Sequence, residues 1–240
     1  MAEIPINKAA DLRQWLHENQ EKSWTPAQVN ARFEIDLSAR QLYRIFTGDF
    51  IINLPKFSFY RAPVRNTNPS KEITIVQLFQ AITGTYYRQV TEIFRAMPAG
   101  REKAEFKTSR FDHVTFAGTF TTRKTDALKQ ASGYVILDYD HVPNFEKLKK
   151  MLINDPILSP ELVFTSPSGD GLKVVVFNSD GADHYVFYQA LTNYLISQYP
   201  DFAQCLDKKT KDIARACFVC YDENCYIKPQ YLTICQALQN

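Results

Sequence analysis

The chain has 240 residues, of which 45% are hydrophobic and 13% aromatic, so it can bury the core of a large domain, with or without a smaller one. Its formal net charge of +2 is too small to indicate a nucleic-acid partner, so any such case depends on local patches. No apolar run approaches the roughly 18 residues of a membrane span, and the first residues lack the basic and apolar regions of a signal peptide. We therefore expect a cytoplasmic protein that does not use a membrane.

Residues 1–55 are expected to form a small helical segment, because apolar residues recur there at helical spacing. Thr25 followed by Pro26 is typical of a helix N-cap with proline at the first helical position. Residues 25–48 resemble a helix-turn-helix unit, although the turn lacks its frequent glycine, and a helical pair that only packs on a neighbour is the alternative. The side chains that would face a DNA groove are those of Arg40, Gln41 and Arg44.

Residues 56–240 are expected to form a second, α/β domain after a proline-rich boundary. Residues 73–96 have a helical pattern that Gly84 divides in two, and residues 101–107 look like a charged connector. From residue 111 onward, short strands alternate with helices, which predicts a sheet covered by helices on at least one face. The expected strands are residues 57–60, 114–116, 119–121, 133–138, 162–164, 172–177 and 216–221. The expected helices are 144–152, with Asn144 as its N-cap, and 184–199.

The most informative motif ends an apolar strand at residues 133–140. Asp138 and Asp140 are two residues apart, so in a strand their carboxylates point to the same face. Two acids on one face repel each other unless a cation joins them. The motif predicts a site for a hard divalent ion, with a strand that runs into an acidic loop as the alternative.

A second motif, residues 166–173, reads Ser-Pro-Ser-Gly-Asp-Gly-Leu-Lys between two predicted strands. Gly169 and Gly171 let the backbone turn tightly and approach a ligand, and Ser168 adds a hydroxyl group. Lys173 begins the next strand and could give a positive charge to a phosphate. The motif therefore predicts phosphate binding, with an ordinary hairpin turn as the alternative.

A third motif interleaves acids and bases between Asp207 and Arg215, before the last predicted strand. It is either a solvated loop or the source of a third metal-facing carboxylate, from Asp207 or Asp212, and of an arginine for a triphosphate. The five cysteines are an odd number, which fits a reducing compartment. Cys217, Cys220 and Cys225 lack a fourth ligand at suitable spacing, so no structural zinc is expected.

These three motifs, in this order, resemble the archaeo-eukaryotic primase superfamily. Its pattern is a strand with Asp-x-Asp, then a Ser-Gly-x-Gly turn, then a later acid near an arginine. A closer resemblance, over about residues 57–240, is to the VirE N-terminal domain, a primase-like domain found in replication and mobilisation proteins of bacterial mobile elements. Lys173 stands where many primases have histidine, which puts polymerisation in doubt more than nucleotide binding.

The resemblance implies an α+β fold, in which an RNA-recognition-motif-like mixed sheet flanked by helices forms a primase-like catalytic core. It also implies a nucleotidyltransferase that binds NTP or dNTP, DNA as a single strand or primed template, and Mg²⁺ or Mn²⁺, with a helicase as a further conceivable partner. The implied catalytic and metal-binding residues are Asp138, Asp140 and Asp207 (or Asp212). The implied nucleotide- and phosphate-binding residues are Ser168, Gly169, Gly171, Lys173 and Arg215.

Two alternatives belong to other functional classes. The chain could be a non-catalytic DNA-binding protein whose primase-like sheet is a degenerate scaffold and whose N-terminal helices bind DNA. A metal-dependent nuclease is the weaker alternative, since two acids also suit phosphodiester hydrolysis. Metal-dependent nucleotide incorporation separates the enzyme from the binding protein.

Overall fold

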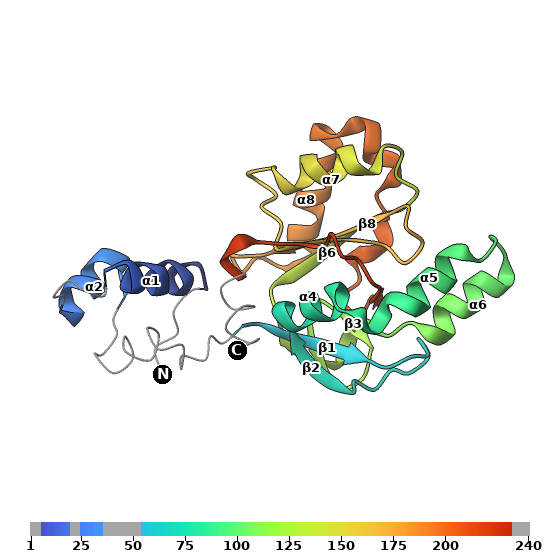
Figure 1. Ribbon diagram of the computed structural model, residues 1–240, viewed down its shortest axis with the longest axis horizontal. Helices are drawn as coiled ribbons and strands as arrows, with labels where there is room; N and C mark the ends of the chain where they lie inside the picture. The colour runs from blue at the N-terminus through green and yellow to red at the C-terminus, as the bar shows by residue number, and fades with distance from the viewer. Residues whose placement is uncertain (1–5, 20–24, 36–53, 232–240) are drawn as a thin grey trace. The chain divides into compact units, whose positions relative to one another are not determined.

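The computed structural model describes residues 6–19, 25–35 and 54–231 of the chain (Figure 1). It divides into two compact units. One contains the described residues up to Leu54 together with those from Lys228, and the other is Pro55–Ile227. In these described ranges, none of the helices has both the length and the apolar character needed to cross a bilayer.

The first unit contains α1 (Ile6–Glu18) and α2 (Pro26–Phe33). Thr25 caps α2 as predicted, since its hydroxyl accepts from the backbone N–H of Gln28 and the Gln28 side chain accepts from the backbone of Thr25. Leu12 and Leu16 of α1 are fully buried. Arg40, Gln41 and Arg44 lie outside the described residues, so the groove-facing helix stays a prediction.

The second unit is built on two four-stranded sheets. In the first sheet, the strand order is β2-β1-β3-β9, and all described pairs are antiparallel. Its strands are β1 (Lys56–Tyr60), β2 (Lys71–Thr74), β3 (His113–Thr115) and β9 (Cys217–Phe218). The accompanying elements are α4 (Ile75–Thr83), α5 (Arg88–Ala96), α6 (Arg101–Arg110) and the hairpin of β4 (Gly118–Phe120) and β5 (Leu128–Ala131).

The second sheet has the order β10-β7-β8-β6, and its described pairs are also antiparallel. Its strands are β6 (Tyr134–Tyr139), β7 (Leu162–Thr165), β8 (Leu172–Phe177) and β10 (Tyr226–Ile227). The helices α7 (Phe145–Ile153) and α8 (His184–Gln198) cover one face, where they form a core with Val135, Leu137 and Tyr139 of β6 (Figure 1).

The other face of this sheet packs toward the first sheet. Tyr134 of β6 meets Phe57 of β1 with their ring centroids 6.0 Å apart. Because both faces are covered, β8 is buried from Leu172 to Val176, which confirms the reading of its apolar sequence as a doubly covered strand.

The second sheet has the chain order of the predicted RNA-recognition-motif-like sheet: strand β6, helix α7, strands β7 and β8, and helix α8. A β-bridge between Tyr139 and Leu206 then places a further short segment along the outer edge of β6. Across the sheet, the segment at Leu206 is therefore followed by β6, β8 and β7. In chain order these are the fourth, first, third and second strands of the β-α-β-β-α-β arrangement. The α+β class is confirmed, with antiparallel rather than mixed pairing in the described strands.

Three local predictions were wrong. Residues 101–107 are not a connector but the first part of α6, where the charges suit an exposed helix and Arg101 pairs with Glu105 at 2.6 Å. The last strand extends only over Cys217–Phe218. Asn144 does precede α7, but it adopts a left-handed conformation and its side chain makes no cap.

Candidate functional site

The end of β6 presents two acids on one face of the second sheet. Leu137 and Tyr139 point into the helix-covered core, so Asp138 and Asp140 point to the opposite face, as the alternation of a strand requires. The side chain of Asp138 is 13% exposed and Asp140 is exposed. The sequence prediction that both carboxylates share one face agrees with this geometry.

A third acid reaches the same face from residues 205–207. The backbone N–H of Asp140 donates to the carbonyl of Cys205, and the N–H of Asp207 donates to the carbonyl of Asp138, both at 2.8 Å. Since Leu206 lies opposite Tyr139, Asp207 lies opposite Asp138 and shares its face. One oxygen from each of Asp138, Asp140 and Asp207 lies within 4.8 Å of the other two, and we call these three residues the acidic cluster.

Asp212, the other candidate for the third acid, is engaged elsewhere. Its carboxylate accepts from the hydroxyl of Thr125 at 3.3 Å and from the backbone N–H of Ala214 at 3.0 Å. The structure thus brings Asp207, and not Asp212, beside Asp138 and Asp140.

Lys173 lies directly against the acidic cluster. The register of β6 and β8 pairs Asp138 with Lys173, and the lysine ammonium forms an ion pair with Oδ2 of Asp138. The Lys173 side chain is 10% exposed. Burial lowers the pKa of Lys173, but the attraction and hydrogen bond of Asp138, together with the nearby Cys217 and Asp140, outweigh it and leave this pKa raised. The lysine therefore keeps its charge at neutral pH.

The other oxygen of Asp138, Oδ1, is buried and has no hydrogen-bond partner among the described residues. Burial raises the pKa of Asp138, and the nearby charges of Asp140 and Asp207 add to this, while Lys173 opposes it. An unpartnered carboxylate oxygen beside two further acids is a favourable place for a cation.

Arg215 lies close to Asp207. Its Nη2 lies 3.6 Å from Oδ2 of Asp207, and its side chain is about half exposed at 46%. Oδ1 of Asp207 accepts from the backbone N–H of Lys209 at 2.9 Å, which fixes the orientation of the carboxylate. The predicted neighbourhood of Arg215 and Asp207 is thus present, with the guanidinium still accessible to an anion.

The glycine turn packs against the end of β6. A Cβ atom on Gly171 would lie 2.3 Å from the carbonyl oxygen of Tyr139, so only glycine allows this approach. Gly169 has φ +87°, a left-handed conformation that suits glycine. The hydroxyl of Ser168 donates to Asp170, and Asp170 pairs with the exposed His141 at 2.6 Å. These contacts join the turn to the loop after Asp140.

Arg95 of α5 binds the backbone of the glycine turn, a role that the sequence did not predict. Its guanidinium donates to the carbonyls of Pro167 at 3.2 Å and Ser166 at 3.3 Å. Nothing in the local sequence links α5 to residues 166–171, so only the tertiary structure shows this role.

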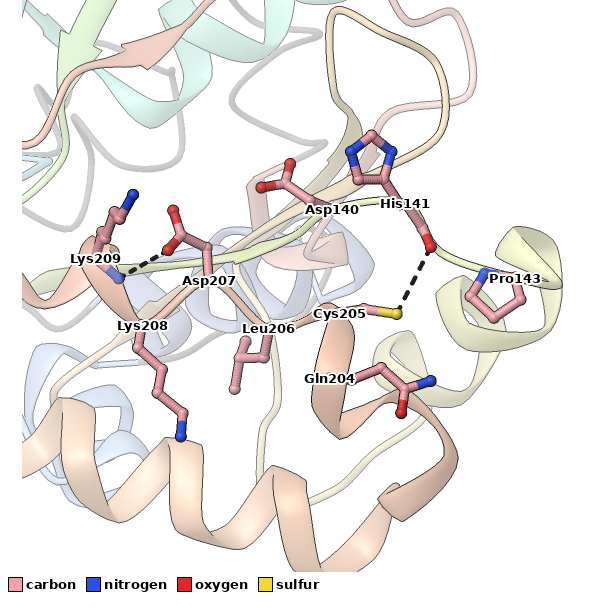
Figure 2. Close-up of a pocket in the computed structure, with 9 residues that line it drawn as sticks. All are labelled: Asp140, His141, Pro143, Gln204, Cys205, Leu206, Asp207, Lys208 and Lys209. Atoms are coloured by element: carbon pink, nitrogen blue, oxygen red, sulfur yellow. Dashed lines mark hydrogen bonds between the residues drawn. The ribbon is translucent and has the colours of Figure 1, made fainter.

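An open pocket of about 630 Å³ adjoins the acidic cluster (Figure 2). In Figure 2, the carboxylates of Asp140 and Asp207 point to the same side, and the side chain of Lys209 extends to that side as well, whereas Lys208 points the other way. The pocket therefore has two carboxylates and a lysine at one wall. Its lining residues are Asp140, His141, Pro143, Gln204, Cys205, Leu206, Asp207, Lys208 and Lys209.

The geometry of the acidic cluster fits a small divalent ion. Around Mg²⁺, with ligands at about 2.1 Å, neighbouring oxygens lie about 3 Å apart and opposite ones about 4.2 Å apart. The three oxygens, all within 4.8 Å of one another, need only a small movement to meet these distances. Oxygen ligands are also the type that Mg²⁺ and Mn²⁺ prefer.

The thiols of Cys217 and Cys220 are buried. Burial, with a smaller contribution from Asp138, raises the pKa of the Cys217 thiol to about 12, and burial also raises that of Cys220 to about 12. Both thiols are therefore protonated at neutral pH.

Comparison with known proteins gives a family but no closer relative. No curated protein and no solved structure matches the chain. The family model described as "BT4734-like, N-terminal domain" matches residues 105–227, which are 123 of the 240 residues. The matched stretch contains the acidic cluster, the glycine turn, Lys173 and Arg215. The chain therefore belongs to the BT4734-like N-terminal domain family.

Proposed function

We propose that residues 55–227 form a nucleotidyltransferase domain of the primase-polymerase type, which binds a nucleoside triphosphate, a divalent metal and DNA. The observation that carries the proposal is the meeting of Asp138, Asp140 and Asp207 on one sheet face, beside an open pocket. These acids come from two separate segments, and the backbone pairing of residues 138–140 with 205–207 holds them together.

Each group would have a distinct task. The acidic cluster would hold Mg²⁺ or Mn²⁺, which supplies Lewis acidity and charge neutralisation to phosphate when bound. Arg215 and Lys209, near Asp207, would pair with phosphate oxygens. The turn with Ser168, Gly169 and Gly171 would seat the remaining phosphates through its backbone N–H groups.

The resemblance to primase-like domains of mobile elements supports a role in replication or mobilisation of such an element. The RNA-recognition-motif-like order of the second sheet agrees with that resemblance. A DNA strand as template, a cytoplasmic setting and a helicase partner belong to the same proposal. Lys173 contributes its charge at Asp138 in this structure, and its expected contact with a phosphate stays a prediction.

A second candidate is a non-catalytic DNA-binding protein on a degenerate primase-like scaffold. The ion pair of Lys173 with Asp138 favours it, because a lysine at this place already neutralises one acid of the cluster. In this alternative, DNA binding depends on residues such as Arg40, Gln41 and Arg44 and needs no metal.

Primer extension with Mn²⁺ and a primed template tests the proposal. We expect incorporation by the wild type and a loss of about 100-fold or more in both Asp140→Asn and Asp207→Asn, because each removes a carboxylate from the cluster. Asp126→Asn, which removes an exposed acid from a turn outside the site, is the matched control and should retain activity.

DNA binding measured with EDTA by fluorescence anisotropy separates the two candidates. Full DNA affinity in EDTA, without incorporation in Mn²⁺ or Mg²⁺ with either NTPs or dNTPs, would reject the enzyme in favour of the binding protein. Incorporation that is unchanged in both Asp140→Asn and Asp207→Asn would reject the acidic cluster as the site.

A further inference from the structure

The contact between Lys173 and Asp138 is built into the strand register. β8 is a central strand with β6 on one side and β7 on the other, so Lys173 has Asp138 and Phe164 as its direct cross-strand neighbours. Phe164 is fully buried, and the side chains of Lys173 and Asp138 are only 10% and 13% exposed. Moving the ammonium away from Asp138 would leave a largely buried charge unpaired, which is costly.

The charges of the acidic cluster and of the two basic side chains that are ion-paired with it are nearly balanced without any bound ion. The three carboxylates carry a charge of −3, while Lys173 at Asp138 and Arg215 at Asp207 supply +2. One divalent ion would change the net charge from −1 to +1, which suits a polyanionic ligand. A second ion would raise it to +3 in a partly buried place, where repulsion between like charges is poorly screened.

The free carboxylate oxygens of the cluster also argue for a single bound ion. Two-ion sites hold their ions about 3.5–4 Å apart, and a carboxylate that bridges two ions in the bidentate mode uses both of its oxygens. Oδ2 of Asp138 is occupied by the Lys173 ammonium, so only Oδ1 remains for a metal. Asp138 therefore cannot bridge two ions through both of its oxygens while the ion pair exists.

We propose that Lys173 is a built-in counter-cation that takes the place of a second divalent ion, so that the acidic cluster binds a single ion. The inference rests on the proposed function, because it assumes that the cluster binds metal, and it defines how that site is regulated. Lys173 acts here through Asp138, as a positioning residue, and its contact with the substrate is not required.

Calorimetric titration of the purified full chain with Mn²⁺ tests the inference without any activity measurement. We expect one ion per wild-type chain. Lys173→Met should bind two ions, or bind its first ion at least about tenfold more tightly. Removal of the ammonium frees Oδ2 of Asp138 and leaves only Arg215 to oppose the three carboxylates, so the net charge becomes −2. Lys147→Met, which removes the same charge from an exposed position of α7 outside the acidic cluster and its pocket, is the matched control and should behave like the wild type within about threefold.

The double variant Asp138→Asn with Lys173→Met covers the case in which Lys173→Met alone does not fold. It removes both charges of the buried pair and leaves an amide oxygen at residue 138, so the net charge of the cluster is unchanged. It should bind one ion with an affinity within about threefold of the wild type. A loss of affinity of more than about tenfold would show that the charge of Asp138 is needed to bind the metal, and would overturn the inference.

The outcomes for the two proposals are separable. Two ions in the wild type, or the same stoichiometry and affinity in Lys173→Met as in the wild type, would overturn the counter-cation and leave a metal site standing. No binding in the wild type, together with binding in Lys173→Met, would overturn both the proposed metal-dependent function and the single-ion site, and would show that the ammonium excludes metal altogether. No binding in either protein would overturn both.

Discussion

Acidification should weaken the fold through His113, a buried residue of β3. His113 has no exposed surface, and its ring stacks on Tyr60 with centroids 4.9 Å apart. Burial lowers the pKa of His113 from 6.5 to about 4, the positive charge of Arg123 adds to this, and Asp112 and the backbone of Asn66 act in the opposite direction. The folded protein thus keeps this imidazole neutral at a pH where the unfolded chain protonates it.

The magnitude follows from proton linkage. Because the folded pKa lies below the unfolded one, the contribution of His113 to stability is complete above about pH 6.5 and falls as the pH decreases toward the folded pKa of about 4. With these two values, the free energy of unfolding should decrease by about 2 kcal/mol by pH 5 and by about 3 kcal/mol in total.

Urea denaturation followed by circular dichroism at about pH 7.5 and pH 5 measures this loss. His113→Phe keeps a planar ring for Tyr60 and cannot be protonated, so it should lose about 2 kcal/mol less than the wild type between the two pH values. The carboxylates titrate alike in both proteins, so the difference isolates His113. Equal losses in the two proteins would refute the reasoning.

Two further predictions concern the surroundings of the site. Gly171→Ala should lower the free energy of unfolding by about 1–3 kcal/mol, because its Cβ would lie 2.3 Å from the Tyr139 carbonyl oxygen. Gly181→Ala, where nothing lies within 4 Å of the new Cβ, should cost only the strain of its φ of +66°; equal costs in thermal or urea melts would contradict the close approach. At about pH 8, iodoacetamide should modify Cys217 and Cys220 only after unfolding, because burial holds both thiol pKa values at about 12. Peptide mass spectrometry that finds both labelled in the native protein would contradict this.

The sequence predicted what depends on local pattern. The two-residue spacing of Asp138 and Asp140 was enough to place both on one face, because strand alternation is a local property. Thr25 and Gly84 marked a helix start and a helix break correctly, since capping and chain breaking also act over a few residues.

What the sequence could not decide depends on contacts between distant segments. Asp207 and Asp212 flank the same basic run, and only the pairing of residues 205–207 with the end of β6 distinguishes them. The ion pair of Lys173 with Asp138 needs the knowledge that β6 and β8 are neighbours, although α7 and β7 separate them along the chain. Register of this kind is a tertiary property.

Both large sheets receive an edge strand from the same late stretch of the chain. β9 completes the first sheet beside β3, and β10 completes the second beside β7. During synthesis, therefore, neither sheet can close before residues 217–227 have left the ribosome, and until then the edges of β3 and β7 are open to wrong partners. A fragment limited to the matched residues 105–227 would keep these late strands but lack β1 and β2, half of the first sheet. The smallest piece that can fold by itself should accordingly begin before Lys56 and extend at least to Ile227.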